Sequence, residues 1–188
     1  MTLADPFADG LPTLEGARVR LRPLRREDRG AVFALYCDKD AVRYGFSPKM
    51  DTLDDADELI DRTHRLALSR EVFHWGAALT ETDEIVGHAT LFHLEKEHRR
   101  AEVGYSVVRH LWGRGIGAAA VTVLVRFAFG ALDLRRLEAD VDPRNTGSLR
   151  LVEKLGFVRE GYMRERWELQ GEIQDAVYFG LLRREWTG

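Results

Sequence analysis

The chain has 188 residues, a formal net charge of −3 at pH 7 and 45% hydrophobic residues, a composition typical of a soluble globular protein. This length predicts one domain that buries roughly 70% of its unfolded surface. The slightly acidic balance gives no field that would hold a polyanion, so we expect no nucleic-acid binding. The single cysteine, Cys37, excludes a disulfide framework within the chain, and the six histidines show no ligand spacing, so we expect no metal site.

No stretch of the sequence predicts attachment to a membrane. The start of the chain carries Asp5 and Asp9 and lacks a basic segment followed by an apolar run, so it does not resemble a signal peptide. The longest apolar-rich stretch, Ile116–Phe129, is interrupted by Arg126 and is too short to span a bilayer. We therefore expect a cytoplasmic protein with no membrane partner.

Hydrophobic periodicity and turn residues predict an alternation of strands and helices. Residues 1–14 hold two of the five prolines and predict a loose N-terminal tail, followed by a single domain over residues 15–188. In chain order, the predicted elements are a strand at 19–24, a helix at 28–37, a loop at 38–50, a helix at 51–69, strands at 72–80, 85–94 and 101–108, a helix at 115–129, a strand at 136–141, a short helix at 145–155 and a hairpin of strands at 157–169 and 172–183.

This order predicts the α+β class. The three strands between residues 72 and 108 are joined by short polar connectors, which favours antiparallel neighbours. Repeated βαβ units are missing, so a doubly wound parallel sheet is not expected. We expect a largely antiparallel mixed sheet of about seven strands flanked by about four helices.

The segment from Glu102 to Ala118 carries the clearest chemical signal. A predicted strand runs into a turn with glycines at 113, 115 and 117, and a helix follows at once. Alternate glycines let the backbone approach a ligand closely, and the free N–H groups of a helix start favour an anion. Arg114 adds a full positive charge, so a phosphate or pyrophosphate is the expected ligand. The alternative is a strand-to-helix turn that glycine eases and no ligand occupies.

The glycine spacing matches neither of two common phosphate-binding motifs. The chain has no G-x-x-x-x-G-K-[ST] loop, and the third glycine comes one residue early for a G-x-G-x-x-G dinucleotide fingerprint. A second segment, 142–148, leads through Asn145 and Ser148 into the short helix that Gly156 ends. On its own this segment is explained by helix capping.

Together these segments resemble the GNAT superfamily of acyl-CoA-dependent N-acetyltransferases, and most of all its RimJ/RimL branch of ribosomal-protein N-terminal acetyltransferases. The resemblance covers about residues 16–183, and the order and spacing of its motifs are specific. The motifs are Val19-Arg20-Leu21-Arg22-Pro23-Leu24, the strand and loop at 102–118, Asn145-x-x-Ser148, Lys154-Leu155-Gly156-Phe157 and the closing hairpin. It implies the GNAT fold and acetyl-CoA as the acetyl donor.

The resemblance also implies which residues bind coenzyme A. Amides of the loop 114–118 would contact the pyrophosphate, the strand end would contact the pantetheine arm, and Asn145 would contact that arm from the other side. Many superfamily members have Gln or Arg in place of Trp112, and the RimJ/RimL branch often has Trp. The implied cofactor-binding residues are Val107, Val108, Trp112, Gly113, Arg114, Gly115, Ile116, Gly117, Ala118 and Asn145.

Two residues are candidates for catalysis. Glu102 matches the position of a catalytic glutamate in the family and is the predicted general base, although a solvated strand end would also explain it. The helix tyrosine that many GNAT enzymes use as acid is replaced by Val152. Ser148 is the predicted substitute, unless it only caps the helix, and Tyr178 is a second candidate.

The acceptor site is less defined. The acidic run from Asp51 to Asp61 either attracts a cationic acceptor or forms an ordinary solvated helix face. The segments 73–76 and 44–46 either line the acceptor pocket or belong to the core. The expected activity is acetyl transfer to a primary amine, either a protein N-terminus or a small molecule, and a second copy of the chain in a homodimer is one partner to test. The alternative is an acyl-CoA-binding sensor or interaction module of the same fold without turnover.

Overall fold

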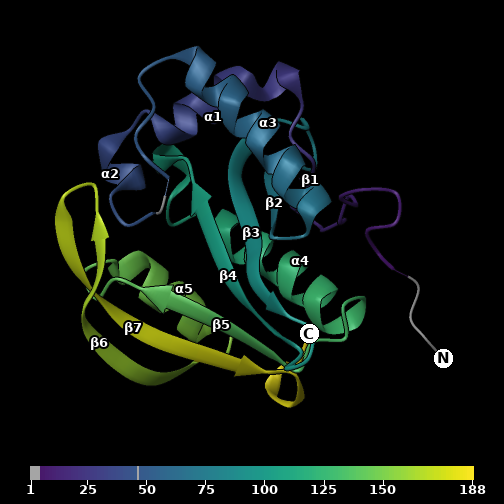
Figure 1. Ribbon diagram of the computed structural model, residues 1–188, viewed down its shortest axis with the longest axis vertical. Coiled ribbons are helices and arrows are strands. Elements are labelled where there is room, and N and C mark those ends of the chain that lie inside the picture. Colours follow the sequence, from purple (N-terminus) through teal and green to yellow (C-terminus); the bar gives the residue numbers. More distant parts are fainter. Residues whose placement is uncertain (1–4, 46) are drawn as a thin grey trace.

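The computed structural model describes residues 5–45 and 47–188, and in this part of the chain a sheet of seven strands carries helices on both faces (Figure 1). The strands are β1 (Val19–Arg22), β2 (Val72–Leu79), β3 (Ile85–Glu95), β4 (Arg100–Val107), β5 (Arg136–Val141), β6 (Val158–Leu169) and β7 (Glu172–Leu182). The helices are α1 (Arg29–Tyr36), α2 (Lys39–Val42), α3 (Leu53–Ser69), α4 (Ile116–Gly130) and α5 (Thr146–Lys154). None of these helices combines the length and apolarity needed to cross a membrane.

The sheet has the strand order β1-β2-β3-β4-β5-β7-β6. All neighbouring strands are antiparallel except β4 and β5, which are parallel. Short turns join β2 to β3, β3 to β4 and β6 to β7, whereas α1–α3 lie between β1 and β2, and α4 provides the long crossover that the parallel pair β4–β5 requires. The α+β class, the number of strands and the antiparallel character predicted from the sequence are confirmed.

Side chains alternate between two distinct faces of the sheet. Trp75 of β2 is fully buried towards α4, with its ring centroid 5.8 Å from that of Phe127. His88 of β3 points the other way, towards α1, and its Nδ1 lies 2.9 Å from the Tyr36 hydroxyl. We call these the α4 face and the α1 face. Successive residues of a strand point to opposite faces, so each functional side chain below is assigned to one of them.

Two sequence-based predictions of local structure are wrong. Residues 38–50 contain α2, which Asp38 caps by accepting a hydrogen bond from the Asp40 N–H at 2.9 Å. The described tail residues 5–14 are not loose, because the Phe7 ring stacks on Phe73 at 4.0 Å between centroids and Leu14 bridges to Leu21. Burial of an aromatic ring on the core outweighs the entropic cost of ordering this segment.

Candidate active site

The site is built where the two parallel strands separate. β4 and β5 pair only through Arg100–Arg136, Ala101–Leu137 and Glu102–Glu138. Beyond these pairs β4 continues to Val107 with β3 as its strand partner, and β5 continues to Val141 with β7 as its partner. The strands therefore diverge into a wedge, which we define as β4 after Glu102 and β5 after Glu138 (Figure 1). In the described part of the chain, the edge of β4 that faces β5 in the wedge has no strand partner, so its backbone groups can bond a ligand.

Buried charges hold the narrow end of the wedge together. Glu138 is 5% exposed and lies at the last paired position of β5. Its carboxylate accepts hydrogen bonds at 2.7 Å from Arg100 of β4 and at 2.7 Å from Arg136 of β5. Charge-assisted bonds of this kind are short and directional. The bond from Arg100 joins the two strands just before they separate, and the bond from Arg136 holds the Glu138 carboxylate in place.

A glycine loop leads into α4 beside the wedge. Gly113 and Gly115 have φ angles of 72° and 79°, and Gly115 is the N-cap of α4. This left-handed conformation is readily open only to glycine, which explains both residues. The N–H groups of Ile116, Gly117 and Ala118 stand in the first turn of the helix and have no intrahelical carbonyl to bond. Three amides and the helix dipole converge there, as an anion site requires.

A second arginine lies beside this loop. The Arg18 Nη1 donates to the Arg114 carbonyl at 3.0 Å, and a Cβ on Gly115 would lie 3.2 Å from the same Nη1. Sequence reasoning identified Arg114 but missed Arg18, because the two residues are far apart in the chain and only the fold of β1 against α4 brings them together. Gly117 has a packing role as well, since a Cβ there would come within 2.9 Å of Leu151 Cδ1 on α5.

The segment between β4 and the glycine loop is held by its own hydrogen bonds. The Trp112 indole Nε1 donates to the Val107 carbonyl at 2.7 Å, although half of the Trp112 side chain is exposed. The Val108 N–H donates to the Val86 carbonyl at 2.9 Å. A carbonyl has two lone pairs, so the Val107 oxygen retains one acceptor position. Trp112 thus fixes the end of β4 at the open end of the wedge.

The α4 face of the wedge carries the predicted acid. Asn145 caps α5, and its Oδ1 accepts the Ser148 N–H at 3.2 Å. The cap therefore uses the backbone of Ser148 and not its hydroxyl. The Ser148 Oγ lies 2.6 Å from the Tyr105 hydroxyl of β4, a contact that sequence reasoning missed. Val152 is fully buried, so the usual tyrosine position offers no acid here.

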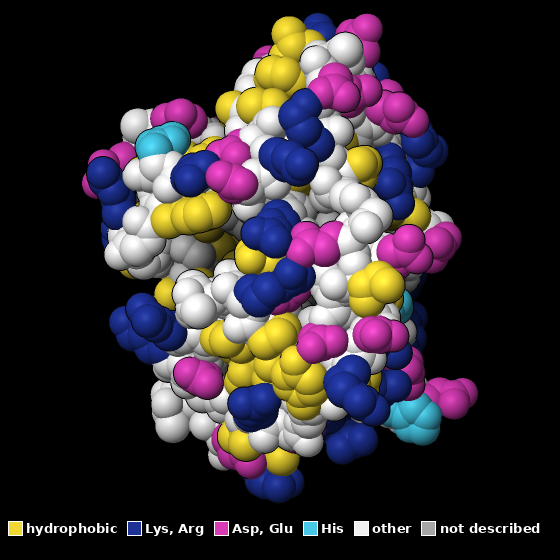
Figure 2. All heavy atoms as spheres, turned by 90° about the vertical axis from the view of Figure 1, so that its left-hand side faces the viewer, with side chains coloured by type: hydrophobic (Ala, Val, Ile, Leu, Met, Phe, Trp, Pro, Cys, Tyr) yellow, Lys and Arg dark blue, Asp and Glu magenta, His cyan; other side chains and the backbone are white. Residues whose placement is uncertain are grey.

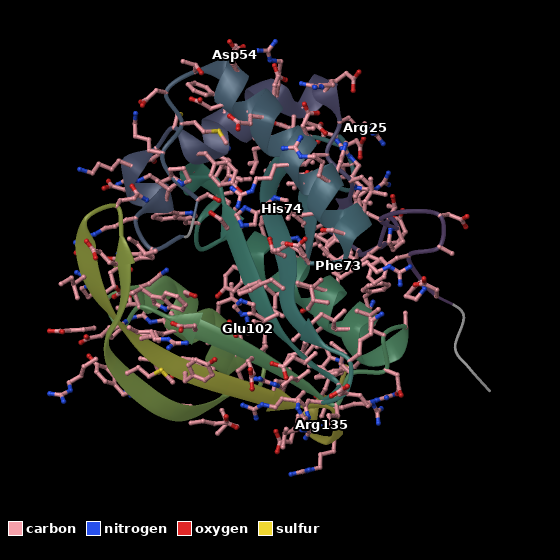
Figure 3. All side chains as sticks on the ribbon, viewed as in Figure 1. Arg25, Asp54, Phe73, His74, Glu102 and Arg135 are labelled. Carbon is pink, nitrogen blue, oxygen red and sulfur yellow. The ribbon has the colours of Figure 1, made fainter. Side chains whose placement is uncertain are left out.

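The α1 face of the wedge carries the predicted base. Glu102 stands at the point where β4 and β5 begin to separate (Figure 3), and its side chain is 14% exposed. Its Oε1 lies 2.9 Å from Nδ1 of the more exposed His93. Glu102 and Tyr105 are three residues apart on a regular strand, so they point to opposite faces. The two candidate catalytic groups, Glu102 and Ser148, therefore flank the wedge from opposite sides of the sheet.

Three further side chains share the α1 face with Glu102. Asp140 follows Glu138 on that face of β5 and pairs with Tyr178 of β7. The Trp167 Nε1 donates to Asp140 Oδ2 at 3.0 Å. Burial, together with the nearby Glu102 charge, raises the pKa of Asp140, and burial and the same charge raise the pKa of Tyr178. Asp140 could have been identified as a candidate site residue from the sequence, because residues 138, 140 and 142 are acidic and alternate with apolar neighbours.

Several predicted acceptor residues have other roles. Phe73 and Trp75 are fully buried on the α4 face, so the pocket interpretation is wrong for them and the core interpretation is right. His74 points to the α1 face, where burial lowers its pKa to about 4. The acidic run does not stand free as a cation attractor, because Arg26 and Arg29 form ion pairs with it. The pairs are Arg26–Asp57, Arg26–Asp61, Arg29–Asp54 and Arg29–Asp57.

The tip of the β6–β7 hairpin reaches the segment after α2. Gln174 Nε2 donates to the Arg43 carbonyl at 3.0 Å, and the Arg43 guanidinium pairs with Glu172 at 2.9 Å. Arg144 also pairs with Glu172, and both guanidinium groups lie within 6 Å of the Tyr44 ring centroid. Positive and negative side chains are interleaved over this side of the molecule (Figure 2). Of the predicted segment 44–46, residue 46 lies outside the described residues.

Comparison with known proteins agrees with this geometry. A family model described as an acetyltransferase (GNAT) domain matches residues 18–158. The uncharacterised N-acetyltransferase p20 of Bacillus licheniformis is 32% identical over 95% of this chain and 100% of its own length. RimJ of Mycobacterium smegmatis, solved with CoA-disulfide, superposes with a TM-score of 0.85 at 24% identity over 95% of this chain and 90% of its own.

A spermidine N-acetyltransferase of Vibrio cholerae, solved with CoA and spermine, has the same fold, with a TM-score of 0.78 at 21% identity over 91% of this chain and 99% of its own. The family match extends over most of the chain and includes β4, the glycine loop, Asn145 and Ser148. The chain therefore belongs to the GNAT family of N-acetyltransferases.

Proposed function

We propose that this chain transfers the acetyl group of acetyl-CoA directly to a primary amine within a ternary complex. One observation carries the proposal: Glu102 and Ser148 flank the β4–β5 wedge from opposite faces of the sheet. An amine that reaches the wedge from the α1 face meets a carboxylate. A thioester sulfur on the α4 face meets hydroxyl groups. This separation suits a substitution in which the nucleophilic amine must lose a proton and the leaving thiolate must be stabilised by a hydrogen-bond donor.

The residues around the wedge fit the chemistry of coenzyme A. The pyrophosphate would accept hydrogen bonds from the amides at the start of α4, with Arg18 and Arg114 supplying positive charge. The pantetheine arm, which carries amide groups, would bond the edge of β4 that has no strand partner in the wedge. Asn145 would contact the arm from α5, because its Oδ1 is used by the cap and its amide N–H groups remain as donors.

The reaction requires that the amine lose a proton. The amine nitrogen forms a bond to the acetyl carbonyl carbon, the carbon–sulfur bond breaks, and its electron pair leaves with the sulfur. An α-amino group with a pKa near 8 is roughly one-tenth neutral at pH 7, whereas a lysine-like amine near 10.4 is less than a thousandth neutral. We assign proton removal to Glu102, directly or through water.

The α1 face of the wedge favours a cationic acceptor. Asp140 and Glu102 place two carboxyl groups on this face and Tyr178 adds an aromatic ring beside them, while the Arg166 guanidinium lies 4.0 Å from Asp140 and 4.7 Å from the centroid of the Trp167 ring. An ammonium ion is attracted both by carboxylates and by aromatic faces. A protein N-terminus and a polyamine both satisfy these conditions, and the two comparison structures are named for a RimJ enzyme and a spermidine N-acetyltransferase.

An assay of thiol release from acetyl-CoA with a panel of amines tests this function. The panel contains N-terminal peptides, polyamines and a peptide whose only free amine is a lysine. We expect thiol release with at least one primary amine and an acetylated product of matching mass. Tight CoA binding without thiol release for any acceptor would favour the sensor alternative. Absence of CoA binding would contradict both functions.

A further inference from the structure

Tyr105 is a partly buried tyrosine that joins β4 to α5 on the α4 face of the wedge. Its hydroxyl lies 2.6 Å from Ser148 Oγ and 3.4 Å from the Ser148 carbonyl oxygen. The ring packs against α4, since a Cβ on Gly117 would lie 4.0 Å from Tyr105 Cδ2 and 3.5 Å from Val107 Cγ2. The phenol is thus directed at the hydroxyl of Ser148.

The surroundings of this pair restrict its hydrogen bonds. Burial raises the pKa of Tyr105 to about 12, so the phenol keeps its proton at physiological pH. The Ser148 N–H is already bonded to Asn145, which fixes the backbone of the serine. When the phenol donates to Ser148 Oγ, the serine proton is free to point away from Tyr105.

A proton transfer from this pair to the leaving sulfur would run uphill. A thiol has a pKa near 8.5, whereas the Tyr105 phenol titrates at about 12. A thiolate is therefore a weaker base than the phenolate that such a transfer would create. A hydrogen bond to the thiolate meets no such barrier, because charge on the acceptor strengthens it.

We propose that Tyr105 is a positioning residue that donates a hydrogen bond to Ser148 Oγ and thereby directs the serine O–H at the thioester sulfur. This role rests on the proposed acetyl transfer. As the carbon–sulfur bond breaks, the electron pair goes to sulfur, which leaves as a thiolate hydrogen-bonded to Ser148. The amine proton goes to Glu102, and neither Ser148 nor Tyr105 changes its protonation state.

The test is a cycle of Tyr105→Phe, Ser148→Ala and the double variant, measured by single-turnover thiol release. We expect Tyr105→Phe to lower the acyl-transfer rate about tenfold and to leave the KM for acetyl-CoA within about twofold, because the interaction acts only on developing charge. Because Tyr105 acts through Ser148, the double variant should be no slower than Ser148→Ala alone. A wild-type rate for Tyr105→Phe, or losses that multiply in the double variant, would overturn the proposal.

A leaving-group series separates positioning from a structural role. With acetyl thioesters of pantetheine analogues whose thiols have progressively lower pKa, the defect of Tyr105→Phe should shrink, because a weaker base needs less stabilisation. A defect that is the same for all thioesters, together with lowered thermal stability, would identify a structural role only. Tyr162→Phe is the matched control, because its hydroxyl also donates a hydrogen bond, to Asp175 of β7.

The same experiments distinguish failure of the proposed acetyl transfer from failure of the proposed role of Tyr105. A wild-type protein that releases thiol with no amine contradicts the proposed function itself. A wild-type protein that transfers acetyl normally, with a Tyr105→Phe variant that matches it, contradicts only the role of Tyr105.

Discussion

Replacing Glu102 with Gln removes the proposed base with little change in side-chain shape. The carboxylate is 14% exposed at the last paired position of β4 and accepts a hydrogen bond from His93 at 2.9 Å when Nδ1 carries the proton. A glutamine oxygen can keep that bond but cannot take up a proton from an ammonium. CoA affinity should change less than about twofold, because the glycine loop and α5 contact the wedge from the other face.

The size of the effect follows from the acceptor's own pKa. With the base present, a bound ammonium is deprotonated in the site, so kcat/KM for the amine should vary little between pH 7 and 9. Without it, only amine that is already neutral reacts, and this fraction rises tenfold per pH unit below the amine pKa. For an α-amine with a pKa near 8, the kcat/KM of the variant should rise nearly tenfold between pH 7 and 9. For an amine with a pKa near 10.4, the kcat/KM of the variant should rise nearly a hundredfold over the same range. At pH 7 the variant should have lost a factor of about 10²–10⁴ in kcat/KM relative to the wild type.

The assay measures kcat/KM for one peptide N-terminus and one polyamine at half-unit intervals of pH, for the wild type and Glu102→Gln. Asp140→Asn is the matched comparison, because it neutralises the other carboxyl group on the same face. Parallel profiles for wild type and Glu102→Gln, differing by a constant factor at every pH, would refute the assignment of Glu102 as base. If kcat/KM rose steeply with pH for Asp140→Asn and not for Glu102→Gln, Asp140 would be assigned as the base.

Three further variants test the wedge and its surroundings. Gly115→Ala forces a side chain into the left-handed conformation, which should cost about 1–2 kcal/mol and lower the Tm by about 2–8 °C in a calorimetric scan, and it should weaken CoA binding measured by titration. Glu138→Gln breaks the ion pairs at the narrow end of the wedge and should cost about 1.5–3 kcal/mol of unfolding free energy in a urea titration. Bonds from Arg43 and Arg144 lower the pKa of Glu172 to about 2, so its stabilising contribution is present above the ordinary value of 4.5 and is lost as pH falls towards 2. Glu172→Gln should therefore differ from the wild type in Tm at pH 6 and match it near pH 2.

Each of these variants has a matched control or a contrary outcome. Gly171→Ala shares the left-handed strain, lies in the β6–β7 turn outside the glycine loop and adds a Cβ that meets nothing within 4 Å, so equal losses of CoA affinity in both glycine variants would argue against a special role of the α4 N-terminus. Glu160→Gln removes the more exposed partner of Arg136 and should cost less than Glu138→Gln. A Tm difference for Glu172→Gln that stays constant from pH 6 to pH 2 would contradict its ionised role.

Local sequence signals predicted most of the fold. Period-two runs identified the strands, the predicted strand at 136–141 coincides with β5, and Asn145 and Gly156 mark the two ends of α5 because they act as helix caps. The glycine loop was predicted for the same reason, since its φ angles restrict it to glycine. These features depend on residues that are close together in the chain.

The features that the sequence did not predict depend on distant contacts. The β4–β5 pair ends after Glu102, where β4 continues with β3 and β5 continues with β7, and no local pattern marks that point. Tyr105 meets Ser148, and Arg18 meets the glycine loop, only once the sheet has formed. The alternation of acidic and apolar residues in β5 could have marked Asp140 as a candidate site residue. Its closeness to Glu102 depends on the parallel register of two strands that are separated by a helix in the chain.

A crystal structure of the protein with coenzyme A bound tests whether the wedge is the cofactor site. We predict that the pyrophosphate lies within hydrogen-bond distance, about 2.7–3.2 Å, of amides at residues 115–118. We also predict that the pantetheine arm runs along β4 in the wedge and that the sulfur lies near Ser148 Oγ. Coenzyme A bound elsewhere, or a wedge closed by direct pairing of β4 and β5, would contradict these predictions.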